Sequence, residues 1–474
     1  MSSGLKRMFK TLFDVEPSER IKLFFLTATF FFVIAGYTLV RELRDSIFSF
    51  IVGKEYLNTA SIISMCMLVP LILVYSKLVD KMRRYYLLCT YSIVYGLITL
   101  LFAYLLGDPV IGLPNTDASQ YRMIGWIFYF FVEGYSPFVV SVFWAFANSV
   151  NSPESARKNY GLMSSGSKVG GMLTAGLAWA LLSGRIFTAH SGSDTFNHQV
   201  ILVISACMTL LVPVFILLLM KYVPGKNLHG YEAAYQVEKQ KKRAGKESAN
   251  VFVGLKMLLK YPYVLGMFSM VFFFEILGKV ISYQRVKIAH ESGASQSDTS
   301  AFLFKMIFFM HAAGFLISLL GTRTLLNKLG EKRCLVLVPL ITGALLLYFV
   351  VSYTAVALIV TGVGIKALNY AFAWPVRENL YIPTVKEIKF KSKSWIDAFG
   401  SKFGKSTGAT FNIIAQKLGT DLFFPAHYLF FSGIVGVWLL VAYLLGRRFE
   451  RAIENNEVIG EELESVEDEA VQRL

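Results

Sequence analysis

Residues 400–408 read Gly400-Ser401-Lys402-Phe403-Gly404-Lys405-Ser406-Thr407-Gly408. This segment places two lysines and three glycines inside a stretch that otherwise predicts a membrane-spanning helix. A lysine at the centre of a bilayer costs about 2.5 to 3.5 kcal/mol on translocon-based scales, so such residues usually face a cavity and mark a substrate path. A related phrase, Gly166-Ser167-Lys168-Val169-Gly170-Gly171, lies in an earlier apolar segment. The motif therefore occurs twice.

The segment has two other interpretations, a phosphate loop and a close-packing helix. Phosphate loops of ATPases have the pattern Gly-x4-Gly-Lys-Ser/Thr after a strand. Here Gly400 is one position too close to Gly404, and the flanking sequence is apolar and helical in character. Small residues four apart, such as Gly404 and Gly408, also allow helices to pack closely in lipid. This second interpretation explains the glycines in part but not the lysines.

The composition is that of a polytopic membrane protein. Of the 474 residues, 55% are hydrophobic, and the mean hydropathy is +0.52. Apolar runs of about 20 residues, the length that spans a bilayer as a helix, recur along the chain. We predict an all-α protein with twelve transmembrane helices, near residues 21–41, 58–77, 85–106, 123–147, 159–184, 199–222, 263–283, 301–321, 334–354, 355–374, 396–418 and 427–446.

The distribution of basic residues indicates how the chain is oriented. Short cytoplasmic loops accumulate Lys and Arg. With the N-terminus in the cytoplasm, most of the 47 Lys and Arg fall in cytoplasmic segments. The formal charge of +15 is therefore a topology signal, and we expect no nucleic-acid partner. The first 20 residues lack a cleavable signal pattern, so we expect the first span to be retained, with both termini cytoplasmic.

Repeated features indicate two six-helix halves. Short basic loops follow the second span of each half, around Lys81 and around Lys332. The Gly-Ser-Lys-x-Gly phrase recurs at a similar offset of roughly 235 to 245 residues. This arrangement fits the parallel repeats of the major facilitator fold. We predict a cytoplasmic N-terminus at 1–20, halves at 21–222 and 263–446, a linker at 223–262 and an acidic cytoplasmic tail at 447–474.

Charged residues within the spans are candidates for function. Arg41 and Arg44 are three apart and share a helix face, although an arginine near a helix end can also reach water by snorkelling. Glu133 can be a proton carrier, a partner of a lysine or a substrate contact, and these alternatives stay open. Glu275 and Lys279 are four apart with the acid first, which also allows them to pair with each other. The roles of two further lysines stay open as well, Lys305 and Lys366.

Together these phrases resemble the ATP/ADP translocases, or nucleotide transporter family, of plastids and obligate intracellular bacteria. The family's Arg-x-x-Lys-Asp pattern after span one matches residues 41–45, with Arg44 in the place of the lysine. Its span-four glutamate and Phe-Trp-Gly-Phe-Ala-Asn phrase match Glu133 and residues 143–148, with Ala145 in the place of the glycine. An arginine keeps the charge of a lysine but changes its geometry at a phosphate site.

Three more phrases carry the resemblance through the second half. The family's Glu-x-x-x-Lys in span seven matches Glu275 and Lys279. Its Gly-Lys-Ser-Gly-Gly matches residues 404–408 and places the functional lysine at Lys405. Its Lys-Glu-x-x-Tyr-Ile-Pro matches residues 377–383. One departure is Trp374, where the family tends to have an acid before the proline.

The resemblance implies a nucleotide transporter of a bacterial inner (cytoplasmic) membrane that exchanges ATP for ADP by alternating access. Phosphates bind Arg and Lys through charge-assisted hydrogen bonds, so we expect a cationic site in a central cavity between the halves. The residues expected to bind substrate are Arg41, Arg44, Glu133, Glu275, Lys279 and Lys405, assisted by Lys168, Lys402 and Tyr37. Tyr37, Tyr135 and Phe403 are candidates for stacking on the base.

Other functions are compatible with the same residues. One alternative is a proton-coupled importer of another anionic metabolite, such as NAD, another nucleoside triphosphate or a phosphorylated solute. A more distant alternative is a lipid scramblase. The absence of a complete phosphate loop, metal cluster or catalytic triad in the sequence argues against an enzyme. We expect no cofactor, no metal and no catalytic residues, a monomer, and ATP, ADP and the lipid bilayer as partners.

Overall fold

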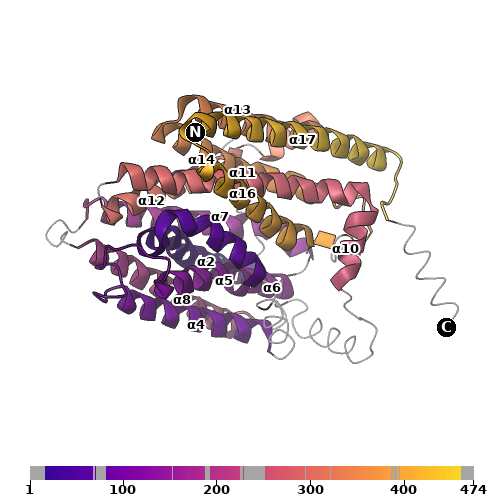
Figure 1. The fold of residues 1–474 in the computed structure, drawn as a ribbon. Helices are drawn as coiled ribbons and strands as arrows, with labels where there is room; N and C mark the ends of the chain where they lie inside the picture. Colours follow the sequence, from indigo (N-terminus) through magenta and orange to yellow (C-terminus); the bar gives the residue numbers. More distant parts are fainter. Residues whose placement is uncertain are drawn as a thin grey trace, which may run out of the picture. The chain divides into compact units, whose positions relative to one another are not determined.

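The computed structural model describes residues 17–67, 70, 82–151, 153–186, 193–224, 228, 251–293, 295–320, 322–385, 388, 392–393 and 395–460. Helices make up nearly all of this part of the chain (Figure 1). The residues group into two compact units. Unit one comprises Met1–Leu57, Cys66–Ser248 and Ala289–His311, and unit two comprises Asn58–Met65, Ala249–Ile288 and Ala312–Leu474.

Unit one is a helical bundle built around its first helix. Its helices are α2 (Pro17–Phe48), α4 (Arg84–Leu105), α5 (Met123–Tyr135), α6 (Ser141–Val150), α7 (Pro153–Leu182), α8 (Asp194–Tyr222) and the first part of α12 (Gln296–Leu320). Helix α2 packs against α5, α7 and α8, and α4 packs against α8. A π-helical segment with a proline near its start, η3 (Ser136–Val140), joins α5 to α6. Such π-helical turns often occur at functional sites.

Unit two is also a helical bundle. Its helices include α10 (Val251–Lys260), α11 (Pro262–Ser292), α13 (Thr322–Ser352), α14 (Ala355–Leu368), α15 (Trp374–Asn379), α16 (Ser401–Lys417) and α17 (Thr420–Glu454). Helix α13 packs against α14, α15 and α17. The π-helical segment η6 (Asn369–Ala373) joins α14 to α15, and η8 (Trp395–Gly400) runs directly into α16.

Glycines bring two pairs of helices into backbone contact. In unit one, a Cβ on Gly170 of α7 would lie 2.6 Å from the carbonyl oxygen of Phe31 on α2. In unit two, Cβ atoms on Gly404 and Gly408 of α16 would lie 2.7 Å and 2.6 Å from carbonyl oxygens on α11. Only glycine permits such close approach, as in small-xxx-small packing of membrane helices. The prediction that the glycines serve helix packing is confirmed.

The two crossings have the same register. An offset of 234 residues relates Gly166 to Gly400 and Gly170 to Gly404. Gly170 contacts Phe31 of α2, and Gly404 contacts Phe272 of α11. These two phenylalanines are related by an offset of 241 residues. The contacts one turn further along show the same two offsets. Thr174 hydrogen-bonds to the Ala35 carbonyl, and Gly408 lies against the Ile276 carbonyl. The repeat is therefore structural as well as sequential.

Eight helices of the described part are long and apolar enough to cross a membrane: Glu19–Met67, Arg84–Leu105, Met123–Val150, Asp194–Tyr222, Pro262–Ser292, Gln296–Ile317, Leu329–Ser352 and Asp421–Glu454. The prediction of a helical integral membrane protein is confirmed. Among the described residues, the β structure consists of one isolated bridge, between Thr384 and Ile459.

The total of twelve spans stays a prediction. The predicted spans at 159–184, 355–374 and 396–418 fall on α7, on α14 with η6, and on η8 with α16. These segments are shorter than the eight, or richer in glycine and lysine. The predicted span at 58–77 is helical as far as Met67 and then enters residues outside the described ranges. Most of the predicted linker at 223–262 also lies outside them.

Candidate functional site

Arg44 lies at the centre of a charged cluster in unit one. Its Nε and Nη2 atoms donate hydrogen bonds of 2.9 Å and 2.7 Å to Oδ1 of Asp45, and its Nη1 donates to Glu133 on α5. The guanidinium carbon lies 4.6 Å from the ring centre of Tyr129, in a cation–π contact. The Arg44 side chain is only 13% exposed. Because a guanidinium stays charged in proteins, the two carboxylates compensate it within the unit.

A second arginine and a tyrosine continue this face of α2. Tyr37, Arg41 and Arg44 are spaced by four and then three residues, so they share one side of the helix. The Arg41 guanidinium lies 5.8 Å from the Tyr37 ring centre, and its Nε lies 3.9 Å from Glu42. The Tyr37 ring stacks on Tyr135 at a centroid distance of 5.2 Å. With 29% of its side chain exposed, Arg41 is the more accessible of the two arginines.

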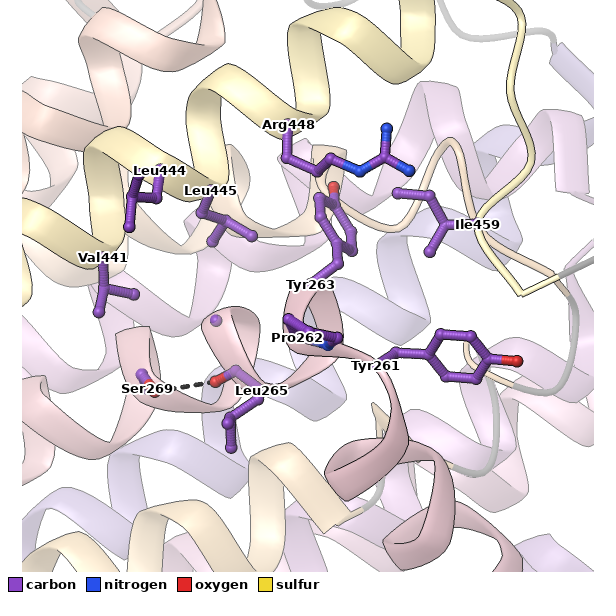
Figure 2. Close-up of a pocket in the computed structure, with 11 residues that line it drawn as sticks. Tyr261, Pro262, Tyr263, Leu265, Ser269, Val441, Leu444, Leu445, Arg448 and Ile459 are labelled. Atoms are coloured by element: carbon purple, nitrogen blue, oxygen red, sulfur yellow. Dashed lines mark hydrogen bonds between the residues drawn. The ribbon is translucent and has the colours of Figure 1, made fainter.

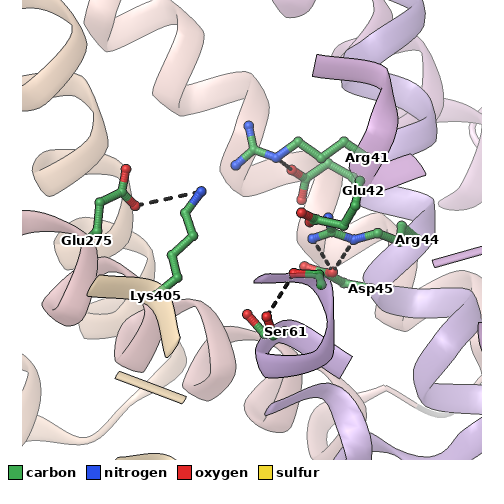
Figure 3. A network of polar contacts seen from close by, with 9 residues as sticks. Arg41, Glu42, Arg44, Asp45, Ser61, Glu275 and Lys405 are labelled. Carbon is green, nitrogen blue, oxygen red and sulfur yellow. Dashed lines mark hydrogen bonds and ion pairs between the residues drawn. The ribbon is translucent and has the colours of Figure 1, made fainter. Parts of the chain in front are cut away.

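Glu275 is the centre of the corresponding cluster in unit two. Its Oε1 accepts a hydrogen bond of 2.9 Å from the Ser401 hydroxyl, and its Oε2 lies 3.8 Å from the Lys405 ammonium. Ser401 and Lys405 are four apart, so one face of α16 contacts both oxygens of a single carboxylate on α11. Figure 3 shows the Lys405–Glu275 pair, and also Arg41, Glu42, Arg44 and Asp45 of unit one.

Lys279 lies where α11 and α16 cross. Its Cβ is 3.1 Å from the position that a Cβ on Gly408 would occupy. The spacing of Glu275 and Lys279 allows an ion pair between them, but the Glu275 carboxylate contacts Ser401 and Lys405 of α16. The partners of Glu275 are therefore set by the packing of α11 against α16 and not by the spacing within α11.

The assisting residues differ in where they lie on their helices. Lys168 and Lys402 occupy equivalent positions under the 234-residue offset, and both are half-buried. Phe403 lies two residues before Lys405, which is about 200° around the helix. Its ring, 40% exposed, stacks on Phe399 at 5.5 Å. Phe403 therefore points to the opposite side of α16 from Lys405.

Two further lysines lie in apolar helices, Lys305 in α12 and Lys366 in α14. The Lys305 ammonium lies 5.8 Å from the ring centre of Trp179, within unit one. Lys366 lies in the last turn of α14. The ring of Trp179 therefore stabilises the Lys305 ammonium.

Sequence reasoning missed one residue that the helix crossings bring to attention. The offset of 241 that relates Phe31 to Phe272 relates Arg44 to Arg285. Arg285 lies in α11 and is only 3% exposed. A buried arginine in a membrane helix is a candidate functional residue by default. The equivalence of Arg44 and Arg285 could not be read from the sequence, because the 241-residue offset depends on which residues are in contact where the helices cross.

Comparisons with known proteins identify the relatives of this chain. The TLC ATP/ADP transporter family matches residues 119–449. ADP,ATP carrier protein 1 of Chlamydia pneumoniae is 24% identical over 505 residues, covering 95% of this chain and 96% of the relative. The chloroplastic ADP,ATP carrier protein 2 of Arabidopsis thaliana is 23% identical over 500 residues, covering 94% of this chain and 78% of the relative.

Solved structures identify the fold. A crystal structure of the D-xylose-proton symporter aligns with a TM-score of 0.59 at 13% identity, covering 90% of this chain and 97% of that chain. This similarity supports the major-facilitator-like architecture and says nothing about substrate. The sequence relationship is more specific, because the family match covers well over half of the chain. The chain is a membrane transporter and belongs to the TLC ATP/ADP transporter family.

Proposed function

We propose that the protein exchanges ATP for ADP across a bacterial inner membrane by alternating access. In this proposal twelve spans form two six-helix halves, at 21–222 and 263–446, with both termini in the cytoplasm. The observation that carries the proposal is the contact of Lys405 with Glu275. Both residues lie in phrases that resemble the translocases, and their contact joins the two phrases across α11 and α16.

The chemistry of the clusters suits a polyphosphate. Phosphate oxygens accept charge-assisted hydrogen bonds from Arg and Lys, and a guanidinium can bind them with two parallel bonds. Lys405 is 42% exposed and lies 3.8 Å from its carboxylate, a separation longer than a hydrogen bond. A phosphate can therefore compete with Glu275 for Lys405. Arg44 is hydrogen-bonded to two carboxylates and is therefore suited to orient a ligand from a fixed position.

The charge count favours exchange over simple import. The candidate cations and the carboxylates beside them are Arg41, Arg44, Lys168, Lys279, Lys402 and Lys405 against Glu42, Asp45, Glu133 and Glu275. The set carries six positive and four negative formal charges, so its net formal charge is +2. Enclosing a net positive charge away from water without an anion is costly. A bound nucleotide removes this cost, so the loaded carrier switches faster than the empty one.

A second candidate function is the proton-coupled import of another anionic metabolite. It is favoured by the observation that Glu133 and Glu275 already contact Arg44 and Lys405. Such contacts lower the cost of switching without substrate, which is what a net importer requires. Glu133 or Glu275 then becomes the proton-carrying group.

Transport assays in proteoliposomes test the proposal. Uptake of labelled ATP is compared in vesicles preloaded with ADP, with phosphate or with nothing. Exchange predicts that uptake depends on internal ADP, whereas net import predicts equal uptake into empty vesicles. Lys405→Ala is expected to reduce exchange roughly ten- to a hundredfold, the value of a charge-assisted hydrogen bond. Lys417→Ala, an exposed lysine in the last turn of the same helix, is the matched control.

A further inference from the structure

A groove runs between the start of α11 and the end of α17 in unit two. It encloses about 470 Å³. Aliphatic and small residues form most of its walls: Pro262, Leu265, Gly266 and Ser269 from α11, and Val441, Leu444 and Leu445 from α17 (Figure 2). Leu265 and Leu444 are 42% and 53% exposed. The groove is therefore open and apolar, as a binding site for a hydrocarbon chain requires.

One end of the groove is polar and basic. Tyr263 and Arg448 lie together at this end, beyond the leucines of α17 (Figure 2). In α17 the sequence changes from Leu444-Leu445 to Arg447-Arg448 within four residues. Helix α11 is preceded by Lys260 and Tyr261, whose ammonium and ring are 5.3 Å apart. Tyrosines and basic residues at helix ends mark the boundary between hydrocarbon and water.

Arg448 already binds an anionic group of the chain's own tail. Its two terminal nitrogens donate to the two carboxylate oxygens of Glu457, one at 2.7 Å. These hydrogen bonds hold the pKa of the Glu457 carboxyl below its usual value. The tail is held in turn by Ile459, which donates to the Pro383 carbonyl at 2.8 Å and accepts from the Val385 amide at 3.1 Å. The guanidinium thus presents a bidentate anion site at the mouth of an apolar groove.

We propose that an anionic phospholipid binds here, with an acyl chain along the groove and its phosphate on Arg448 in place of the Glu457 carboxylate. The phosphate is a bidentate acceptor like the carboxylate it replaces. The apolar walls favour an amphiphile over a soluble phosphate, because only the amphiphile buries hydrocarbon. Basic pockets between helices at the membrane surface are known to bind lipid head groups. Glu457 acts as a built-in competitor for the same guanidinium.

The amount of lipid that stays bound to the purified protein tests whether an anionic phospholipid occupies this groove. The full-length protein is purified from nanodiscs of phosphatidylglycerol and phosphatidylcholine in equal amounts, and bound lipid is counted by native mass spectrometry. The wild type is expected to retain phosphatidylglycerol preferentially. Arg448→Gln should lower that retention about tenfold or more, as expected for the loss of a charge-assisted hydrogen bond to the phosphate. Glu457→Gln should raise it, because the competitor is neutralised.

The controls separate a built site from general charge attraction. Arg451→Gln removes an exposed charge one turn further along α17 and should leave retention unchanged. Equal losses in the Arg448 and Arg451 variants, or equal retention of both lipids by the wild type, overturn the proposal. A loss in the Glu457 variant also overturns it, since tail release then explains the Arg448 effect. Glycerol phosphate should not displace the lipid. The assay involves no transport, so its failure leaves the proposed exchange standing.

Discussion

Ser401 donates a hydrogen bond of 2.9 Å to one oxygen of the Glu275 carboxylate. The other oxygen lies 3.8 Å from Lys405, one helical turn further along α16. The hydroxyl therefore holds the acid away from its closest approach to the lysine. In the proposed exchange, this leaves Lys405 accessible to a phosphate.

Replacing Ser401 by alanine is expected to raise the KM for ATP severalfold with a smaller change in the maximal rate. Without the hydroxyl, the carboxylate turns towards Lys405 and competes with the substrate, which removes ground-state binding. Initial rates of ATP uptake across a range of concentrations measure both constants. Ser401→Thr keeps the hydroxyl and should restore the KM. Thr407→Ala, whose hydroxyl bonds to the Phe403 carbonyl of its own helix, is the control.

Substitutions at Arg44 and at its partner Glu133 should have non-additive effects on stability. Arg44→Gln removes the guanidinium that contacts both Asp45 and Glu133 in a part-buried site, a change that costs about 3 kcal/mol or more. Adding Glu133→Gln removes one of the two like charges. The double variant should therefore unfold at a higher temperature than Arg44→Gln alone. Thermal unfolding in detergent measures this, and losses that simply add would show that Arg44 and Glu133 are not coupled.

Much of the charged site could be anticipated from the sequence, but the partners of its residues could not. The patterns singled out Arg44, Glu133, Glu275 and Lys405 because charges in apolar helices are rare. The spacing within α11 suggested Lys279 as a partner of Glu275. The contact with Lys405 depends on the approach of α16, which spacing along one helix does not describe.

The fold shows the same division. Apolar runs predicted the helices, and the repeated glycine phrase predicted two related halves. The offset of 241 between α2 and α11 could not be predicted, because it follows from which carbonyls the glycines touch. The π-helical segments η3 and η6 also escaped prediction, since apolar periodicity does not distinguish them from the α-helices that they interrupt.

Arg285 tests whether the repeat extends to function. If it serves the substrate as Arg44 is proposed to do, Arg285→Gln should reduce ATP exchange roughly tenfold or more through a higher KM. Lys287→Gln, two residues on, removes a cation that lies 4.8 Å from the Phe423 ring and should have a small effect. Arg285→Lys keeps the charge and should recover part of the loss. An unchanged KM in Arg285→Gln, with normal yield, would show that the equivalence is structural alone.

The crossing of α16 and α11 should tolerate no side chain at Gly408. A Cβ there would lie 2.6 Å from the Ile276 carbonyl oxygen and 3.1 Å from the Cβ of Lys279, so Gly408→Ala must push the helices apart. We expect a destabilisation of about 1 to 3 kcal/mol, as for overpacked cores, and a loss of exchange as Lys405 moves away from Glu275. Gly433→Ala in α17 is the matched control, because a Cβ there has no atom within 4 Å and alanine favours the helix. Thermal unfolding and exchange assays of both variants test this prediction. Equal stability of Gly408→Ala and Gly433→Ala would mean that α16 does not depend on glycine for its position.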